Sequence, residues 1–464
     1  MRWTILGRGW PLLLALTLAS GAAAQDAHYW SRQFGNRAWL LGGSLMGAPA
    51  DISAVYYNPG ALALLTTPEF ELSGSVVEYS RITVANGLGP GKDLTTSRIN
   101  VPPALLAGTL RFGWLGRARM GYAFITREGF DTRLQRQDTF SGMDVLGISG
   151  LQSLSTDVRL EQGVREYWTG VSLAYPLGRF LGVGITPFLA VRDEHASLLA
   201  ISQGAGNEGQ LLLATLNRDY RMQHARFLAK LGISYQEPKW AVGLTVTLPS
   251  LSLWGKGEAT FERALAHEGL SLGPLTRVSD FQQNTRATFR SPLAVGLGGN
   301  RTFGSTTVHA AVEAFAKVAP FRMVDTRPIE LPDGEELPSA DIFYGLDPVV
   351  NAAVGVEQRL AESLRAYVSF HTDFSGAADL PNTSSLLSTW DLYHWAMGFY
   401  FRVGYSRVTL GTDLAWGRRT TQRLTELLAQ SGLPPTSEGQ GVRYFQATLI
   451  LGATFGLDDP RPFQ

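Results

Sequence analysis

The chain has 464 residues, with 40 basic and 40 acidic side chains and no cysteine. The lack of cysteine excludes disulfides, thiolate metal sites and thiol catalysis, and the balanced charge gives no basis for nucleic-acid binding. Only 17% of residues are charged, too few for an ordinary soluble surface, yet no run of about twenty apolar residues follows the N-terminal stretch, which excludes helical membrane spans.

Residues 1–24 have the pattern of a secretory signal peptide. Arg2 and Arg8 supply the positive start, Trp10–Leu18 the apolar stretch, and Ala22-Ala23-Ala24 a small-residue cleavage site. We therefore expect cleavage after Ala24. No cysteine follows that junction, which argues against a lipoprotein.

Residues 25–66 show no clean alternation of polarity. The stretch includes Asn58-Pro59-Gly60, a turn sequence in which Pro presets φ and Gly admits a positive φ, and Asp51 or Ser53 can cap a short helical turn before it. A segment this apolar cannot lie exposed in water. We expect it to form a hatch, or plug, inside the lumen of a barrel made by residues 67–464.

The rest of the chain alternates between apolar and polar positions with a period of two. Trp240, Val242, Leu244, Val246 and Leu248 share one parity, and similar stripes recur about fourteen times with Trp and Tyr at their ends. This period places each parity on one face of a strand, and aromatic ends suit membrane interfaces. The pattern predicts an all-β, transmembrane antiparallel β-barrel of about fourteen strands; the alternative is a soluble sandwich with one buried face. The expected strands are 69–80, 103–113, 117–127, 164–176, 180–192, 221–235, 239–248, 285–298, 302–316, 349–357, 363–372, 390–402, 407–417 and 440–456.

The connectors between these strands alternate between short and long. Trp114–Gly116 and Pro176–Arg179 are short, whereas Glu128–Ser155 and Asp193–Tyr220 are long. Outer-membrane barrels have this layout, with tight periplasmic turns and extended extracellular loops. Apolar segments in the long connectors either capture a ligand or bury one another as a lid: Leu198–Ile201, Leu211–Ala214, Leu248–Trp254, Leu270–Leu272 and Leu424–Leu433.

The N-terminal motif resembles a known family. Gly42-Gly43-Ser44-Leu45, followed by Asp51-Ile52-Ser53-Ala54-Val55-Tyr56-Tyr57-Asn58-Pro59-Gly60-Ala61-Leu62, is similar to the signature of the FadL and toluene-transporter family of outer-membrane transporters. The chain departs from the family pattern at Ile52 and Gly60, where Ala is usual. The resemblance implies a monomeric fourteen-stranded barrel closed by an N-terminal hatch, with ligand captured at the extracellular side. It also implies release once the hatch shifts, in some members sideways through a gap beside a kinked strand.

Candidate ligand-binding residues follow from parity. If apolar residues face lipid, then Arg226, Lys230, His371 and Arg402 point into the lumen. Arg226 and Lys230 lie four residues apart on one strand face, so together they can hold a carboxylate in a mostly apolar pocket. The alternative is that these charges balance Glu313 and Asp413 in a structural network.

Signals for catalysis are weak. The sequence has no Gly-x-Ser-x-Gly and no His-Glu-x-x-His, and although Ser369 and His371 share a strand face, this is the coincidence expected of a chain with many serines. Asp193-Glu194-His195 can touch a metal but reads as a solvated loop. We expect no enzyme activity, no cofactor and no metal.

The sequence therefore predicts an outer-membrane transporter of a Gram-negative bacterium. Its ligands are expected to be hydrophobic small molecules, either long-chain fatty acids or aromatic hydrocarbons, which enter passively past the hatch. Outer-membrane lipid surrounds the expected monomer, and nucleic acid is not a partner. Two alternatives remain open: a general-diffusion porin, and a barrel that serves protein secretion or surface docking.

Overall fold

The computed structural model describes residues 27–456 apart from 48, 67, 89–90, 101–102, 273–274, 332–335, 381, 385–388, 404–405 and 422–439. The predicted signal peptide at residues 1–24 and its cleavage site therefore lie outside the described residues. No helix in the described part has the length and apolar content that a membrane crossing requires.

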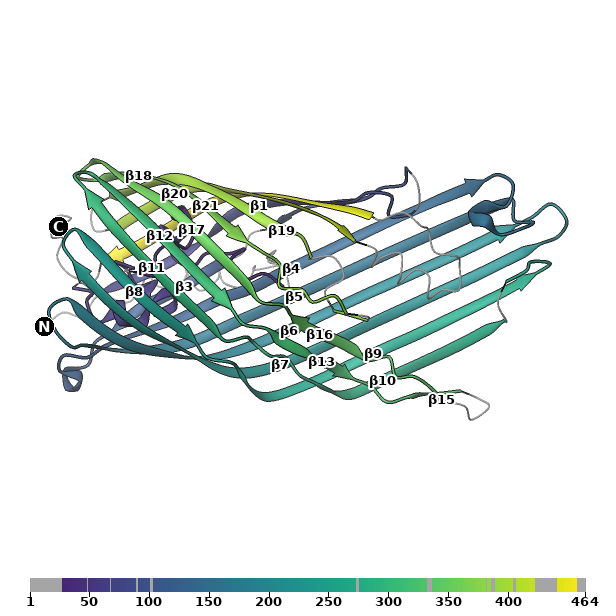
Figure 1. Cartoon of the computed structure of the whole chain (residues 1–464), viewed down its shortest axis with the longest axis horizontal. Coiled ribbons are helices and arrows are strands. Elements are labelled where there is room, and N and C mark those ends of the chain that lie inside the picture. The colour runs from purple at the N-terminus through teal and green to yellow at the C-terminus, as the bar shows by residue number, and fades with distance from the viewer. Residues whose placement is uncertain are drawn as a thin grey trace, which may run out of the picture.

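Fourteen antiparallel strands close into a barrel (Figure 1). The first and last strands pair with each other, from Glu69 opposite Gly456 onward, so the wall has no free edge at this seam. The fold predicted from alternation is confirmed. The barrel strands are β1 (Glu69–Val84), β3 (Pro103–Leu110), β4 (Arg119–Ser141), β5 (Ser153–Pro176), β6 (Leu181–Ala205), β7 (Leu211–Glu237), β8 (Trp240–Thr247), β11 (Ala294–Phe303), β12 (Thr306–Phe315), β17 (Val349–Ala361), β18 (Leu364–Asp373), β19 (Asp391–Val403), β20 (Ser406–Thr421) and β21 (Gln440–Gly456).

The outer surface of the barrel is apolar where the sequence pattern predicts it. Val242, Leu244, Leu297, Val354 and Leu410 are all exposed on the outside, while the opposite parity is buried or small. A water-soluble protein does not leave a continuous belt of this kind uncovered. The belt therefore fits a wall that faces acyl chains.

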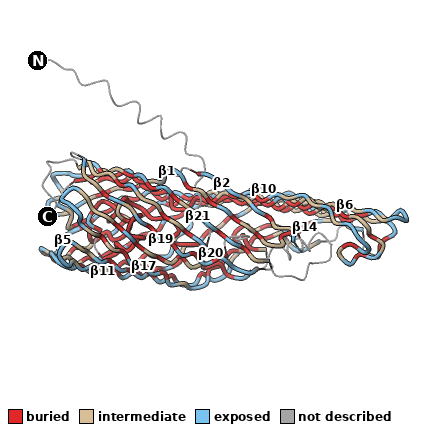
Figure 2. The backbone as a smooth tube through the Cα atoms, turned by 90° about the horizontal axis from the view of Figure 1, so that it is seen from above, coloured by how far each residue is buried: buried red, intermediate tan, exposed pale blue. Residues whose placement is uncertain are grey.

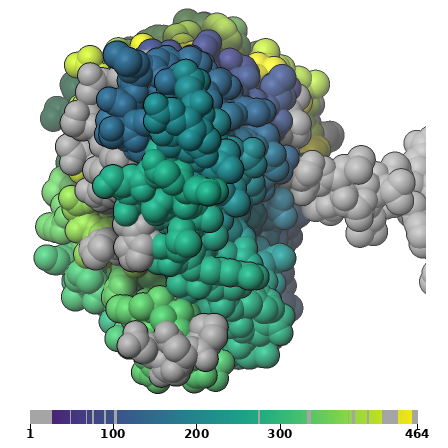
Figure 3. Space-filling view, turned by 90° about the vertical axis from the view of Figure 1, so that its right-hand side faces the viewer, coloured from purple at the N-terminus to yellow at the C-terminus, as the bar shows by residue number. Residues whose placement is uncertain are grey.

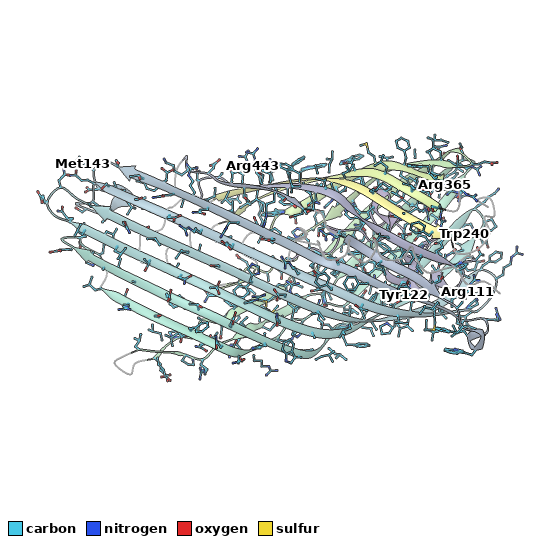
Figure 4. All side chains as sticks on the ribbon, turned by 180° about the vertical axis from the view of Figure 1, so that it is seen from behind. Arg111, Tyr122, Met143, Trp240, Arg365 and Arg443 are labelled. Carbon is cyan, nitrogen blue, oxygen red and sulfur yellow. The ribbon has the colours of Figure 1, made fainter. Side chains whose placement is uncertain are left out.

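Four strands run far beyond the rest of the barrel. β7 has 27 residues, roughly 90 Å of chain at about 3.3 Å per residue, whereas crossing the membrane takes about ten residues. β4, β5 and β6 are nearly as long, and β9 (Leu251–Glu268) and β10 (Thr276–Ala287) continue the same tall sheet. Figure 4 places Met143 at its tip and Arg111 and Trp240 at the opposite end of the molecule. We call the tall side the extended end. The prediction that Glu128–Ser155 and Asp193–Tyr220 are loops is wrong, because most of these residues continue the ladders.

The inner face of the extended end is apolar. Leu134, Leu160, Leu198 and Leu216 are buried there and form one cluster with Trp390. The arrangement follows from the alternation of side chains along β6: Leu198 and Ala200 face inward and are buried, whereas Leu199 and Ile201 face the other side. Of the predicted capture segments, Leu198–Ile201 and Leu211–Ala214 are strand, Leu248–Trp254 leads into β9, and Leu270–Leu272 is a connector. Leu424–Leu433 lies outside the described residues. Figure 3 looks onto this end, where the tall strands (blue to teal) stand along one side.

One predicted strand spans a break in the wall. Residues 285–298 are divided between β10 and β11, and residues 288–293 between them are not strand. Pro292 lies in this interval, and proline has no amide hydrogen to donate to a ladder. The remaining elements are short: β2 (Leu94–Asn100), β13 (Val318–Asp325), β14 (Ile329–Glu330), β15 (Glu336–Leu337), β16 (Ile342–Leu346), η2 (Gly113–Leu115) and η3 (Val145–Gly147).

The N-terminal segment fills the lumen. Its helices are α2 (Asn36–Leu40), α3 (Ala54–Tyr57) and α4 (Pro59–Leu62). α2 packs against β18–β21 and β1, whereas α4 packs against β4–β7 on the other side. Trp39, Leu40 and Leu41 are at most 2% exposed, and burying each such side chain contributes about 1.5–3 kcal/mol. Figure 2 shows the buried residues (red) crowded inside the broad half of the barrel. We refer to residues 27–66 as the hatch.

Candidate functional site

The Asn58-Pro59-Gly60 turn anchors the hatch to the wall. Asn58 is the N-cap of α4: its Oδ1 accepts a hydrogen bond from the Gly60 amide at 3.0 Å, and Pro59 takes the first helical position. The Asn58 Nδ2 donates to the carbonyls of Met46 at 2.9 Å and Ile233 at 3.0 Å. One side chain thus links the turn, the preceding hatch segment and β7.

Glycine is needed at position 60 for close approach, and the predicted positive φ is wrong. Gly60 is helical and is not among the positive-φ glycines of the described chain. A Cβ at this position would lie 2.7 Å from the carbonyl oxygens of Gly182 and Gly232. Carbon and oxygen do not approach that closely, so a larger residue would push α4 off the wall.

The wall meets this turn with a patch of its own glycines. Gly182, Gly184, Gly232 and Gly243 lie on the adjacent strands β6, β7 and β8, and we call them the glycine patch. A Cβ on any of the four would come within 2.4 Å of an atom of residues 58–60. Their alignment across three strands appears only in the register.

Charged groups tie the rest of the hatch to the wall. Arg37 of α2 forms an ion pair with Glu357 of β17 at 2.6 Å. Asp373 of β18 accepts hydrogen bonds from the amides of Tyr29 and Trp30, at 3.0 and 2.9 Å. The Asp373 hydrogen bonds are buried, and the Arg37–Glu357 pair is largely buried, with side chains 12% and 6% exposed. Breaking a buried ion pair on one side costs about 3–5 kcal/mol because the other charge is left uncompensated.

A small cavity separates the hatch from the wall on the side of the extended end. Its volume is about 70 Å³, room for only a few water molecules. Aromatic rings make up much of its surface: Tyr29, Tyr56, Trp168, Phe289, Phe315 and Tyr344. We call it the luminal cavity. Its aromatic walls suit an apolar occupant, and its size requires side chains or the hatch to move before a larger molecule fits.

Two arginines and a glutamate form one charged cluster in the lining of the luminal cavity, which also includes Arg127, Glu128 and Arg290. The carboxylate of Glu166 accepts hydrogen bonds from Arg226 at 2.6 Å, Arg192 at 3.0 Å and Trp168 at 2.5 Å. Arg192 and Arg226 also stack on the Phe289 ring, with guanidinium-to-centroid distances of 3.9 and 4.8 Å. In the described part of the chain, the buried Arg226 Nη1 has no hydrogen-bond partner.

Lys230 lies in the same cavity. Its ammonium is 3.8 Å from Glu313 and 4.5 Å from the centroid of the Tyr56 ring in the hatch. Glu313 in turn accepts a hydrogen bond from the Trp30 indole at 2.8 Å. The structure therefore brings Arg226 and Lys230 together, as the sequence suggested, but each has a carboxylate neighbour.

The other two candidate residues lie elsewhere. His371 is buried beneath the hatch, with its Nε2 3.3 Å from the Trp30 carbonyl oxygen. Arg402 is half-buried at the opposite end of the barrel, paired in register with Arg407 near the β19–β20 turn. Neither lines the luminal cavity.

Sequence reasoning missed most of the cavity. Glu166 and Trp168 share the inward parity of β5, and Arg192 opposes the outward Leu189 and Val191, so a signal for these three was present. Phe289 carried none, because the expected strand 285–298 ran straight through the break at 288–293. Tyr56 carried no signal either, because the N-terminal segment in which it lies has no regular alternation of polar and apolar residues.

Three side chains have the composition of a metal site. One donor atom from each of His371, His394 and Asp413 lies within 4.8 Å of the others. The two imidazoles are stacked, however, at 4.2 Å and 13°, so their in-plane lone pairs run side by side and do not converge. A metal would bind only after one ring turned. His371 forms no hydrogen bond with Ser369 within the described chain, since the Ser369 hydroxyl and the His371 Nδ1 both have no partner.

Asp193, Glu194 and His195 do not form a site. They lie in β6, where adjacent side chains point to opposite faces. Glu194 is buried and pairs with Arg192 and Tyr220, whereas Asp193 is outside with Arg221 and Gln223. The expectation that they lie on a solvated loop is wrong, because β6 continues to Ala205.

The fold and its contents define a class: a fourteen-stranded transmembrane β-barrel whose lumen holds an N-terminal hatch. No protein-family model matches the sequence, and no curated protein matches it. Solved structures do match along nearly the whole chain. A FadL homologue from Pseudomonas aeruginosa aligns with a TM-score of 0.57 at 10% identity, covering 93% of this chain and 100% of that one.

Two further solved structures are similar. The toluene transporter TodX of P. putida aligns with a TM-score of 0.55 at 14% identity, covering 92% of this chain and 99% of its own. The toluene transporter TbuX of Ralstonia pickettii gives 0.52 at 13% identity, with the same coverage. The fold expected from the resemblance to this family is confirmed. At these identities the likeness concerns the fold alone.

Proposed function

We propose that this protein is an outer-membrane transporter of a Gram-negative bacterium, through which hydrophobic small molecules enter passively. The observation that carries the proposal is the luminal cavity, where six aromatic side chains line the space beside a set of charged groups and the hatch closes one side. Such a cavity suits an apolar solute, because aromatic surface replaces the water that the solute would otherwise order. The fold shared with a FadL homologue and two toluene transporters supports it.

The hatch is proposed to act as the gate. A cavity of about 70 Å³ is too small for a fatty acid, so passage requires displacement of the hatch. Asn58 and the glycine patch hold one side of the hatch, and the Arg37–Glu357 pair holds the other. A ligand that wedges apart Tyr56 and Trp168 would act on the first of these anchors.

Arg226 and Lys230 are proposed to bind the polar end of a ligand. The unpartnered Nη1 of Arg226 offers a donor toward a carboxylate or a hydroxyl, while Glu166 holds the guanidinium in place. His371 and Arg402 would contact the ligand later, below the displaced hatch. Fatty acids and aromatic hydrocarbons both remain candidates. No step needs a catalytic group, a cofactor or a metal.

Deletion of residues 25–66 tests the gate. In planar bilayers the deletion should raise single-channel conductance well above that of the full-length protein. Conductance no higher than that of the full-length protein would contradict a plug. If the protein is instead a general-diffusion porin, the undeleted protein should already show large conductance. If it serves protein secretion or surface docking, another protein should co-purify with it.

Uptake measurements test the ligand class. Cells carrying the protein should take up radiolabelled oleate or toluene faster than cells with an empty vector, and Arg226→Ala with Lys230→Ala should slow oleate more than toluene. Equal rates with and without the protein would contradict the transport proposal. Size-exclusion chromatography with light scattering tests the expected monomer.

A further inference from the structure

The barrel wall has a gap at the junctions β8–β9 and β10–β11. The β8–β11 ladder ends at Thr247 opposite Ala294, and the β9–β10 ladder resumes only at Lys256 opposite Arg286. Between them, within the described chain, two hydrogen bonds join the sides: Ser250 N to Ser291 O at 3.4 Å and Ser291 N to Ser250 Oγ at 2.8 Å. The two segments are therefore without ladder pairing to each other over residues 248–255 on one side and 287–293 on the other.

An open cleft of about 650 Å³ occupies this gap. Its apolar lining includes Leu253, Trp254 and Leu293, whose side chains are 60%, 53% and 38% exposed. Leu253 and Trp254 follow the exposed Leu244 and Leu248 along the chain, and the charged Lys256 comes two residues after Trp254. The cleft thus lies where the apolar belt ends toward the extended end, the level at which aromatic side chains meet lipid head groups.

Three cations border the same cleft: Arg286, Arg290 and Lys317. All three are exposed. Within the described residues neither arginine has a carboxylate partner, and Arg290 only stacks on the Phe321 ring at 4.8 Å. Lys317 has an exposed carboxylate partner at the limit of an ion pair, Asp347 at 4.0 Å. Two cations without an ion pair and a third with only a weak one, beside an apolar cleft at a membrane interface, are complementary to an anionic amphiphile.

We propose that this cleft binds a lipid of the outer leaflet, with an alkyl chain along Leu253, Trp254 and Leu293 and a phosphate head group on Arg286, Arg290 and Lys317. We assign a membrane lipid as the occupant, because the apolar lining of the cleft is exposed on the outer wall and the adjacent cations match a phosphate head group. The luminal cavity shares only the segment Arg290–Pro292 with it. The proposal stands independently of the transport function.

Photolabelling of the purified full-length protein tests the site. The probe is dodecyl phosphate with a diazirine in its chain, read out by peptide mass spectrometry. Label is expected on residues 249–255 and 286–293. Replacing the three cations together, Arg286→Gln, Arg290→Gln and Lys317→Gln, should lower labelling about 10-fold, since each exposed charge contributes modestly. Heat-dependent gel mobility shows that the variant is still a folded barrel.

Controls separate charge from position. The triple variant Arg133→Gln, Arg165→Gln and Arg221→Gln removes three exposed cations of the extended end and should label like the unmodified protein. Dodecanol and inorganic phosphate should compete weakly, and dodecanoate less well than dodecyl phosphate. Unchanged labelling of the cleft variant, label confined to peptides of the luminal cavity, or stronger competition by dodecanoate would each overturn the assignment.

Discussion

Asn58 of the hatch donates a hydrogen bond from Nδ2 to the backbone carbonyl of Ile233 at 3.0 Å, across 175 positions of sequence. The bond crosses from the lumen to the wall at the glycine patch, where the wall presents no side chain to the turn. It makes the turn predicted from Asn58-Pro59-Gly60 a point of close contact between the hatch and the barrel wall.

Asn58→Ala should loosen the hatch. The substitution leaves the carbonyls of Met46 and Ile233 and the amide of Gly60 without their side-chain partner, at a cost of about 1–3 kcal/mol for each group that stays buried. We expect more frequent opening events in single-channel recordings. Asn217→Ala on β7, which removes only a surface hydrogen bond to Glu262, should leave the recordings unchanged.

Gly232→Ala should also displace the hatch, by steric conflict. The new Cβ would lie 2.2 Å from Asn58 Oδ1, and overpacking of this kind costs about 1–3 kcal/mol. Limited proteolysis should then cut the hatch sooner. Gly178→Ala is the matched control, because its Cβ meets no atom within 4 Å. Identical digestion of the two variants would show that the glycine patch does not seat the hatch.

Glu166→Gln should destabilise the barrel and change its ligand preference. Arg192 would keep its ion pair with Glu194, whereas Arg226 would lose its ion pair with Glu166, and an uncompensated buried charge costs about 3–5 kcal/mol. The freed Arg226 should bind carboxylates more tightly, measured by oleate titration against toluene. Glu161→Gln, on the same strand but in an exposed pair with Arg133, should alter stability by at most about 1 kcal/mol.

Acid should release the β2 edge from β4 at the extended end. Hydrogen bonds from Lys92 and then Arg136 lower the pKa of Asp138 from its ordinary 3.8 to about 2. Because the folded pKa lies below the unfolded one, this contribution is complete above about pH 4 and is lost as the pH falls toward 2. Hydrogen exchange of Leu94–Asn100, corrected for intrinsic rates, should accelerate in that window. Asp138→Asn should abolish this pH dependence of hydrogen exchange. If the exchange of this variant still accelerates as the pH falls from about 4 to about 2, another group is responsible.

Much of the barrel follows from local sequence. Val242, Leu244 and Leu410 face outward because side chains on a strand alternate, and that period needs no knowledge of neighbouring strands. The hatch was predictable because the N-terminal segment lacks this period of two and is too apolar to lie exposed in water. Arg226 and Lys230 share a cavity for the same reason, as residues four apart on one strand face.

Sequence alone determined which side chains of each strand point outward and that the apolar segment before β1 has to be buried, because both depend on the polarity of near neighbours. Tertiary structure decided the rest. In the extended end, Leu198 of β6 and Leu216 of β7 point inward and are buried in one apolar cluster with Trp390. That cluster exists only because the long strands lie side by side in the folded barrel. The glycine patch and the luminal cavity depend on register between strands and on the docked hatch, so residues such as Gly232 and Phe289 acquire their roles from partners far away in the chain.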